Sequence, residues 1–230
     1  MLPSTEWKRN TYKRPEQKKW FGGETISLGI GQGYNAFTML QLATATTILA
    51  NGGNKFTPRV VRATQDALTH QQQNLANTAL EPLGYKPEHL DVVRNGLIGV
   101  ATSGTSAQVF AGAAYQSAGK TGTAQAVTIG QKDKYNAAKL SEHQRDHALY
   151  MAFAPVEDPQ IALAVIVENA GFGAAHAAPI ARRVFDYWLL GQYPSEEDIA
   201  ATQQGLTSRP VGTPRAKKDV PLEAVNRSRR

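Results

Sequence analysis

The sequence contains no cysteine, which excludes structural disulfides and thiolate metal sites. Aromatic residues make up 8% of the chain, and no apolar run approaches the roughly 20 residues that a membrane-spanning helix needs. The first residues also lack the pattern of a signal peptide. What remains is a chain of 230 residues, 41% hydrophobic and 19% charged, which predicts a soluble globular domain with one sizeable core.

Strings typical of serine nucleophiles are almost absent. No Ser-x-Asn or Tyr-x-Asn string occurs, and the one Ser-x-x-Lys string runs from Ser117 to Lys120. That motif works on a helix, where residues three apart share a face. These residues fall in an expected strand, where positions i and i+3 point to opposite faces. We therefore expect no nucleophile in this chain.

Metal and nucleotide sites are not expected either. The five histidines show no metal-site spacing, because a strand is expected to begin between His143 and His147, the one pair that lies four apart. The string Gly119–Thr121 resembles the end of a phosphate-binding loop, but that motif needs a glycine where Ala114 stands. The sequence therefore predicts no metal and no cofactor.

The positive charge is concentrated at the C-terminus. The net charge is +6, and residues 209–230 contain seven Lys or Arg and two Asp or Glu. Such a segment either contacts nucleic acid or anionic lipid, or is a solvated, disordered tail. No aromatic residue lies among the basic ones, so a nucleic-acid partner is not expected. We expect residues 1–194 to form the folded part and residues 195–230 a basic, disordered tail.

The first half predicts helices and loops. The expected elements are a basic connector at residues 1–19, a glycine-rich loop at 26–35, a helix at 36–49 with Asn35 as its N-cap, a strand at 55–63 and a polar surface segment at 64–86. The motif Asn51–Gly53 is expected to end the helix through left-handed backbone geometry.

The second half predicts an antiparallel sheet. A helix is expected from Pro87 to a break at Thr102–Ser106, followed by strands at 115–127, 147–154 and 161–168, the last two as a hairpin. A final amphipathic helix spans 177–190, with Ile180, Val184, Phe185 and Trp188 expected to face inward and Arg182, Arg183 and Asp186 outward. Sequential strands between helices predict an α+β fold, an antiparallel sheet flanked by helices.

Lys120 is the strongest candidate for chemistry. One cation beside the hydroxyls of Thr121 and Thr123 suits an anion, above all a carboxylate, and Gly122 lets a ligand approach the backbone. The alternative is a strand lysine that extends into solvent. Glu168, Asn169 and His176 flank another glycine-rich loop and either border a cleft or belong to the ordinary polar surface.

The string Gly119–Gln125 resembles the third motif box of class B penicillin-binding proteins. Further strings agree with this family in order and spacing: Gly23–Tyr34, Ala50–Gly53, Tyr135–Asn136, Arg145–Ala148, Ala152–Pro155, Val167–Asn169 and Ala178–Ala181. Over roughly residues 1–190 the combination is most similar to the C-terminal part of the elongation-specific subfamily, penicillin-binding protein 2.

The resemblance implies the α+β fold of penicillin-binding and serine β-lactamase-like transpeptidases, and a role in cross-linking peptidoglycan at the D-Ala-D-Ala end of stem peptides. Lys120 would hold the catalytic hydrogen-bond network, and Thr121 and Thr123 would bind the carboxylate of substrate or β-lactam. Thr123 would also give a backbone N–H to the oxyanion hole, while Gly122 would keep the strand accessible. The parent protein would act at the periplasmic face of the bacterial inner membrane, with a cell-elongation glycosyltransferase as a further expected partner.

One departure from the family concerns the nucleophile. The family's serine, its partner lysine and its second box lie upstream of this box and have no counterpart here. Without the serine no acyl-enzyme can form. We therefore expect this chain alone to be inactive, to require the upstream half of the domain as a partner, and to expose apolar surface. The alternative is a complete, non-catalytic module that binds a carboxylate ligand through Lys120 and Thr121.

Overall fold

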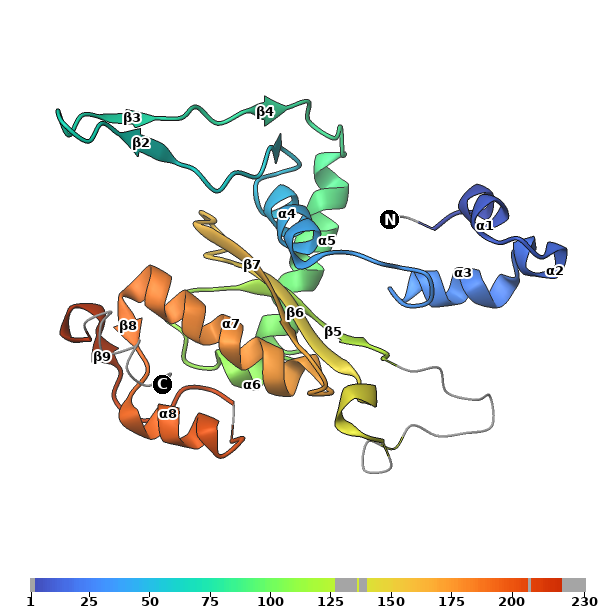
Figure 1. Cartoon of the computed structure of the whole chain (residues 1–230). Helices are drawn as coiled ribbons and strands as arrows, with labels where there is room; N and C mark the ends of the chain where they lie inside the picture. The colour runs from blue at the N-terminus through green and yellow to red at the C-terminus, as the bar shows by residue number, and fades with distance from the viewer. Residues whose placement is uncertain (1–2, 127–135, 137–139, 207, 221–230) are drawn as a thin grey trace.

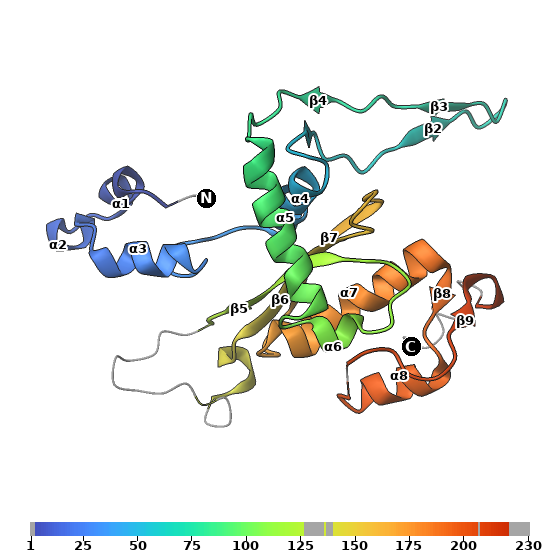
Figure 2. The same cartoon turned by 180° about the vertical axis from the view of Figure 1, so that it is seen from behind.

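The computed structural model describes residues 3–126, 136, 140–206 and 208–220. Its centre is an antiparallel sheet of strands β5 (Ala118–Ala124), β6 (His147–Ala154) and β7 (Ile161–Val167), in that order. Helix α7 (Gly173–Leu190) covers one face, and helices α4 (Met39–Ala50) and α5 (Pro87–Thr102) cover the other (Figures 1 and 2). The predicted α+β fold is confirmed, as is the hairpin of β6 and β7.

Two apolar clusters fill the space between these layers. Alanines of β6 and α7 pack with Tyr150 and Phe185 on the α7 side, joined by Phe110 of the short helix α6 (Ala107–Phe110). On the opposite face Phe153 packs with small residues of α4 and β5. Alternate residues of β6 therefore supply both cores, as expected for a strand covered on its two faces.

The N-terminal segment folds differently from the sequence prediction. The expected connector instead forms helices α1 (Thr5–Thr11) and α2 (Pro15–Lys18), and helix α3 (Gly22–Gly29) occupies the start of the expected glycine-rich loop. Ser4 caps α1 by accepting a hydrogen bond from the backbone N–H of Trp7 at 3.0 Å. The segment lacks apolar periodicity because its packing depends on aromatic rings, those of Trp7, Tyr12 and Tyr34.

Helix α4 begins three residues later than predicted. Its N-cap is Thr38, whose hydroxyl accepts from the backbone of Gln41 while the Gln41 side chain accepts from Thr38, a capping box. Asn35, the predicted cap, instead donates to the carbonyl of Gln32 at 3.0 Å. The predicted end is confirmed, since Gly52 and Gly53 take positive φ angles of 73° and 92°.

Residues 55–80 form a projecting arm (Figures 1 and 2). The expected strand at 55–63 is wrong, because β1 (Lys55–Phe56) pairs with β4 (Ala79–Leu80), while β2 (Ala63–Gln65) pairs with β3 (Gln72–Asn74). Pairing beyond β1 stops near Pro58, which has no N–H to donate. The expectation of an exposed polar segment after residue 64 is confirmed.

Helix α7 turns a different face to the core than predicted. Of the four residues expected inside, Phe185 is buried, whereas the side chains of the other three are exposed. Arg182 and Asp186, expected outside, are buried and paired with each other. The sheet-facing surface consists of Ala177, Ala178 and Ala181 beside Phe185, because small residues let the helix approach the sheet closely.

Regular secondary structure, which the sequence predicts to end near Pro194, continues beyond this residue. Ser195 caps helix α8 (Glu196–Gln203), and strands β8 (Gln192–Tyr193) and β9 (Arg215–Ala216) pair before a 3₁₀ turn at Lys217–Asp219. A second 3₁₀ turn, Glu142–Gln144, precedes β6. The division at residue 194 stays a prediction, and residues 221–230 lie outside the described part.

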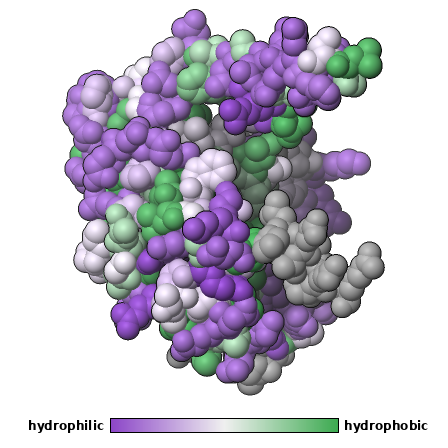
Figure 3. Space-filling view, turned by 90° about the vertical axis from the view of Figure 1, so that its left-hand side faces the viewer, coloured by the Kyte–Doolittle hydropathy of each residue, from purple (hydrophilic) through white to green (hydrophobic). Residues whose placement is uncertain are grey.

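The face carrying the arm and the C-terminal elements is mainly hydrophilic (Figure 3). Hydrophobic residues form small patches there among polar ones. Among the described helices, none is both long and apolar enough to cross a membrane.

Candidate functional site

Strand β5 carries the predicted anion-binding residues along an outer strand of the described sheet. It pairs with β6 on one side, with Lys120 opposite Met151 and Thr123 opposite Ala148. Strand alternation places Lys120 on one face and Thr121 and Thr123 on the other. A ligand lying along the edge of β5 can therefore contact side chains from both faces.

An open groove runs beside this strand, on the face that carries Lys120. The connector between α3 and α4 forms one wall, and β5 together with apolar residues of β6 and β7 forms the other. The groove has a volume of about 430 Å³ and is lined by Phe37, Leu149, Met151 and Ile166 besides the predicted site residues. The exposed Lys120 directs its ammonium to the carbonyl of Thr121 at 2.8 Å. A cation next to an apolar floor suits an amphipathic ligand that carries an anionic group.

The connector wall is held by a charged pair in the N-terminal segment. Lys8, which is 3% exposed, forms an ion pair with Glu24 and donates to the carbonyl of Lys19 at 2.7 Å. Glu24 also accepts from the hydroxyl of Tyr34 at 3.1 Å and from the backbone N–H of Phe21 at 2.9 Å. Burial alone would raise the pKa of Glu24, but these hydrogen bonds lower it below its usual value. The ionised carboxylate thus fixes Tyr34, which lies in the middle of the connector between α3 and α4.

Beneath β5 lies a buried hydroxyl pair. Tyr150, opposite Thr121 in the sheet, has its hydroxyl 3.0 Å from the hydroxyl of the fully buried Ser106. A Cβ atom at Gly119 would lie 2.4 Å from the Tyr150 hydroxyl, so only glycine fits there. Burial raises the pKa of Tyr150 to about 12, against the smaller opposing effect of the hydrogen bond with Ser106. The phenol is therefore neutral at physiological pH and supports the strand from below.

The first turn of α7 contacts β5 and β6 directly. A Cβ atom at Gly173 would lie 2.1 Å from the carbonyl oxygen of Leu149 and 2.6 Å from that of Gly122. Glycine is therefore required where the helix meets the strand. This contact places the positive end of the α7 dipole beside the centre of the predicted site.

Sequence reasoning missed one contact of a site residue. The hydroxyl of Thr105, in the loop between α5 and α6, lies 3.0 Å from the hydroxyl of Thr121. The string Thr102–Ser106 predicts a helix break, which is confirmed, but nothing in it indicates a partner 16 residues away. Such a contact depends on the packing of α5 against β5.

The other candidates are not brought together. Ser117 is buried directly before β5, whereas Lys120 is exposed, so the one Ser-x-x-Lys string does not form a joint site. His143 is exposed in a 3₁₀ turn, while His147 on β6 accepts from the backbone N–H of Asn169 at 3.0 Å. In the described part of the chain no three His, Asp or Glu side chains gather as a metal site would need.

Several known proteins are similar to this chain in sequence. Residues 8–186 match the family model described as the penicillin-binding protein transpeptidase domain. A peptidoglycan D,D-transpeptidase, MrdA, of Haemophilus influenzae is 41% identical over 204 residues, which cover 85% of this chain and 30% of that protein. The chain therefore spans about 30% of the length of this relative.

Solved structures share the fold. PBP2 of Pseudomonas aeruginosa, solved in complex with WCK 5153, is 37% identical with a TM-score of 0.64. The match covers 83% of this chain and 38% of that one. PBP2 of Helicobacter pylori, solved in complex with MreC, is 25% identical with a TM-score of 0.63 and covers 83% of this chain and 31% of that one.

Proposed function

The chain belongs to the penicillin-binding protein transpeptidase family, and we propose that it supplies the carboxylate-binding wall of a peptidoglycan D,D-transpeptidase. The observation that carries this proposal is the placement of Lys120, Thr121 and Thr123 on an outer strand beside an open groove with an apolar floor. The nucleophilic serine comes from an upstream half of the domain. In this proposal the chain alone transfers no peptide.

Each residue of the strand has its own role. Lys120 holds the hydrogen-bond network around the incoming serine and adds positive potential near the substrate carboxylate. Thr121 and Thr123 donate hydrogen bonds to that carboxylate, and the backbone N–H of Thr123 stabilises the oxyanion of the tetrahedral intermediate. Gly122 admits the ligand to the backbone of the strand. Tyr150 and Gly173 keep this strand in position from the α7 side.

The substrate is a stem peptide that ends in D-Ala-D-Ala, and β-lactams occupy the same groove as substrate mimics. The parent protein acts at the periplasmic face of the bacterial inner membrane, with a cell-elongation glycosyltransferase as partner. The similarity to MrdA proteins, named as peptidoglycan D,D-transpeptidases, supports this assignment. The association of the Helicobacter relative with MreC supports a role in a larger cell-wall assembly.

The upstream half of the domain closes the groove. Ile30 and Phe37 of the connector and Ile166 of β7 are exposed large apolar residues that line it. Contiguous apolar surface of this kind marks an interaction site. Covering it would exclude water from the reaction and bring the serine to the strand.

Labelling with a fluorescent penicillin tests the proposal. The isolated chain should give no covalent band, whereas a mixture with the separately produced upstream half of the Haemophilus relative's domain should give a band on the upstream polypeptide. Lys120→Ala should reduce that labelling at least tenfold, and Lys55→Ala, a lysine on the projecting arm, should leave it unchanged. A stable band on the isolated chain would disprove the division of labour. Labelling that is insensitive to Lys120→Ala would disprove the role of this strand.

A further inference from the structure

We propose that Thr105 is a positioning residue for the carboxylate-binding site, and that it holds the hydroxyl of Thr121 so that its proton points to the ligand. This inference rests on the proposed function for the nature of the ligand. Its structural basis is the 3.0 Å contact between the two hydroxyl oxygens, which joins the α5–α6 loop to strand β5.

The loop that carries Thr105 is rigidly built. Gly104 donates its backbone N–H to the carbonyl of Gly99 at 2.8 Å, and a Cβ atom on Gly104 would lie 2.8 Å from the Cα of Val100. Ser106 donates both its backbone N–H and its hydroxyl to the carbonyl of Val100, each at 3.1 Å. The residues on both sides of Thr105 are therefore fixed to the last turns of α5.

The same loop is tied to the sheet at a deeper point. The buried hydroxyl of Ser106 contacts the hydroxyl of Tyr150, and Tyr150 lies opposite Thr121 in the register of β5 and β6. Adjacent residues of one loop thus contact β6 in the core and β5 near the surface. This double attachment sets the distance between Thr105 and Thr121, whereas a surface threonine in a loose loop would not hold a fixed partner.

Hydroxyl chemistry then determines the direction of the bond when a ligand is present. A carboxylate is an acceptor with no proton to give, so Thr121 must donate its single proton to it. The oxygen of Thr121 remains an acceptor, and Thr105 is placed to donate to it. A donor on the Thr121 oxygen polarises its O–H and strengthens the bond to the carboxylate. Thr105 therefore acts through Thr121 and does not need to touch the ligand.

The side-chain rotamer of Thr121 gives a test that needs no ligand. Three-bond NMR couplings to the Thr121 methyl should report a single χ1 rotamer in the chain and in Thr105→Ser. Thr105→Val, which keeps the shape but lacks the hydroxyl, should show averaging over rotamers. Ser103→Ala is the matched control, because Ser103 is exposed in the same loop and its hydroxyl donates locally, to the carbonyl of Gly99. An unchanged rotamer in Thr105→Val would overturn the positioning role.

Ligand discrimination gives the second test. N-acetyl-D-Ala-D-Ala and its C-terminal amide are titrated into the chain and followed by NMR. The chain should prefer the carboxylate, and Thr105→Val should weaken carboxylate binding about threefold to tenfold with little effect on the amide. Thr105→Ser should restore the preference. An equal loss for both ligands would indicate a merely structural role and overturn the inference.

These outcomes separate the two proposals. If the unmodified chain shows no preference for the carboxylate over the amide, the proposed carboxylate wall fails in this chain, and the rotamer measurement alone decides whether Thr105 positions Thr121. If the preference is present and Thr105→Val keeps it in full, the proposed function stands and the role of Thr105 fails.

Discussion

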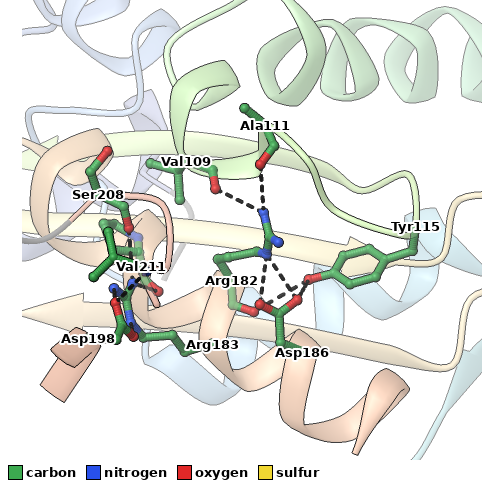
Figure 4. Close-up of polar contacts among 10 residues, drawn as sticks. Val109, Ala111, Tyr115, Arg182, Arg183, Asp186, Asp198, Ser208 and Val211 are labelled. Carbon is green, nitrogen blue, oxygen red and sulfur yellow. Dashed lines mark hydrogen bonds and ion pairs between the residues drawn. The ribbon is translucent and has the colours of Figure 1, made fainter. Parts of the chain in front are cut away.

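Arg182 and Asp186, one turn apart on α7, form a buried ion pair with 2.9 Å between the guanidinium Nε and each carboxylate oxygen (Figure 4). The carboxylate also accepts from the hydroxyl of Tyr115 at 2.8 Å, and Arg182 donates to the carbonyl of Val109 at 3.1 Å. The pair thereby connects α7 to α6 and to the segment that leads into β5. Its position in the core makes it a stability determinant for the candidate site.

Breaking this pair should be costly. Asp186→Leu leaves the guanidinium buried without its partner, so the free energy of unfolding should fall by about 3–5 kcal/mol. The double variant Arg182→Met, Asp186→Leu should recover part of that loss, since no charge is then stranded. Urea unfolding followed by circular dichroism measures both. Glu196→Gln, at an ion pair whose Glu196 side chain is largely exposed, is the control and should change stability by at most about 1 kcal/mol. The prediction would be contradicted if Asp186→Leu lowered the free energy of unfolding by no more than Glu196→Gln does.

Gly173→Ala should disturb strand β5 from the face of the sheet that α7 covers, which is opposite to the groove. The added methyl group would overlap the carbonyl oxygens of Leu149 and Gly122, so helix and strand must move apart. We expect a destabilisation of about 1–3 kcal/mol and shifted amide resonances in β5. Gly99→Ala in α5 is the matched control, because nothing lies within 4 Å of its added Cβ and alanine favours helix. Equal effects of the two substitutions would disprove the close approach.

The folded chain should lose stability in alkali partly through Tyr150. Its pKa is raised from an ordinary 10.0 to about 12, so the folded state binds the phenolic proton more tightly than the unfolded state. The associated stability is complete below pH 10 and is lost as the pH rises from about 10 to 12, by roughly 2–3 kcal/mol in total. Tyr115, whose pKa is also raised by burial and by Asp186, contributes in the same direction.

Tyr150→Phe should therefore reduce the slope of stability against pH above 10 without abolishing it. At neutral pH the variant should cost about 1 kcal/mol, because Ser106 keeps its bond to the carbonyl of Val100. Urea unfolding at a series of pH values measures the slope. Tyr85→Phe, at an exposed tyrosine, is the control. The attribution to Tyr150 is wrong if its removal leaves the alkaline slope unchanged.

The outer side of α7 should promote self-association of the isolated chain. Ile180, Val184 and Trp188 recur every four residues on this helix and are exposed, Trp188 by 62%. Replacing all three by glutamine should lower the sedimentation coefficient toward that of a monomer and leave thermal stability nearly unchanged. Leu68→Gln on the projecting arm, also exposed, is the control. Association that persists in the triple variant would exclude this surface as its cause.

Local patterns were sufficient for much of the central sheet. The bounds of β6 follow from the continuous apolar run that comes after His147, and the start of α5 follows from Pro87 at the first helical turn. Both are local signals. The lysine-threonine-glycine string lies in a segment that is predicted to be a strand. Its glycines indicate that a ligand or another backbone segment approaches this strand closely. The family, too, could be recognised from short strings in a fixed order.

Tertiary structure decided what local patterns could not. The amphipathic pattern of α7 favours Ile180, Val184 and Trp188 as the core face, but in the structure alanines of α7 pack against the sheet. Arg182 and Asp186 are buried because they form an ion pair with each other. The N-terminal helices pack through aromatic rings around Lys8 that are distant in sequence.

The partner of Thr121 shows the same division. Residues 119–123 determine by themselves that a cation, two hydroxyls and a flexible backbone share one strand. The packing of distant segments determines that the hydroxyl of Thr105 contacts Thr121. It also determines that Gly173 of α7 lies against the backbone of Gly122. The local sequence determines which functional groups the strand carries, whereas contacts between residues far apart in the chain determine how those groups are oriented.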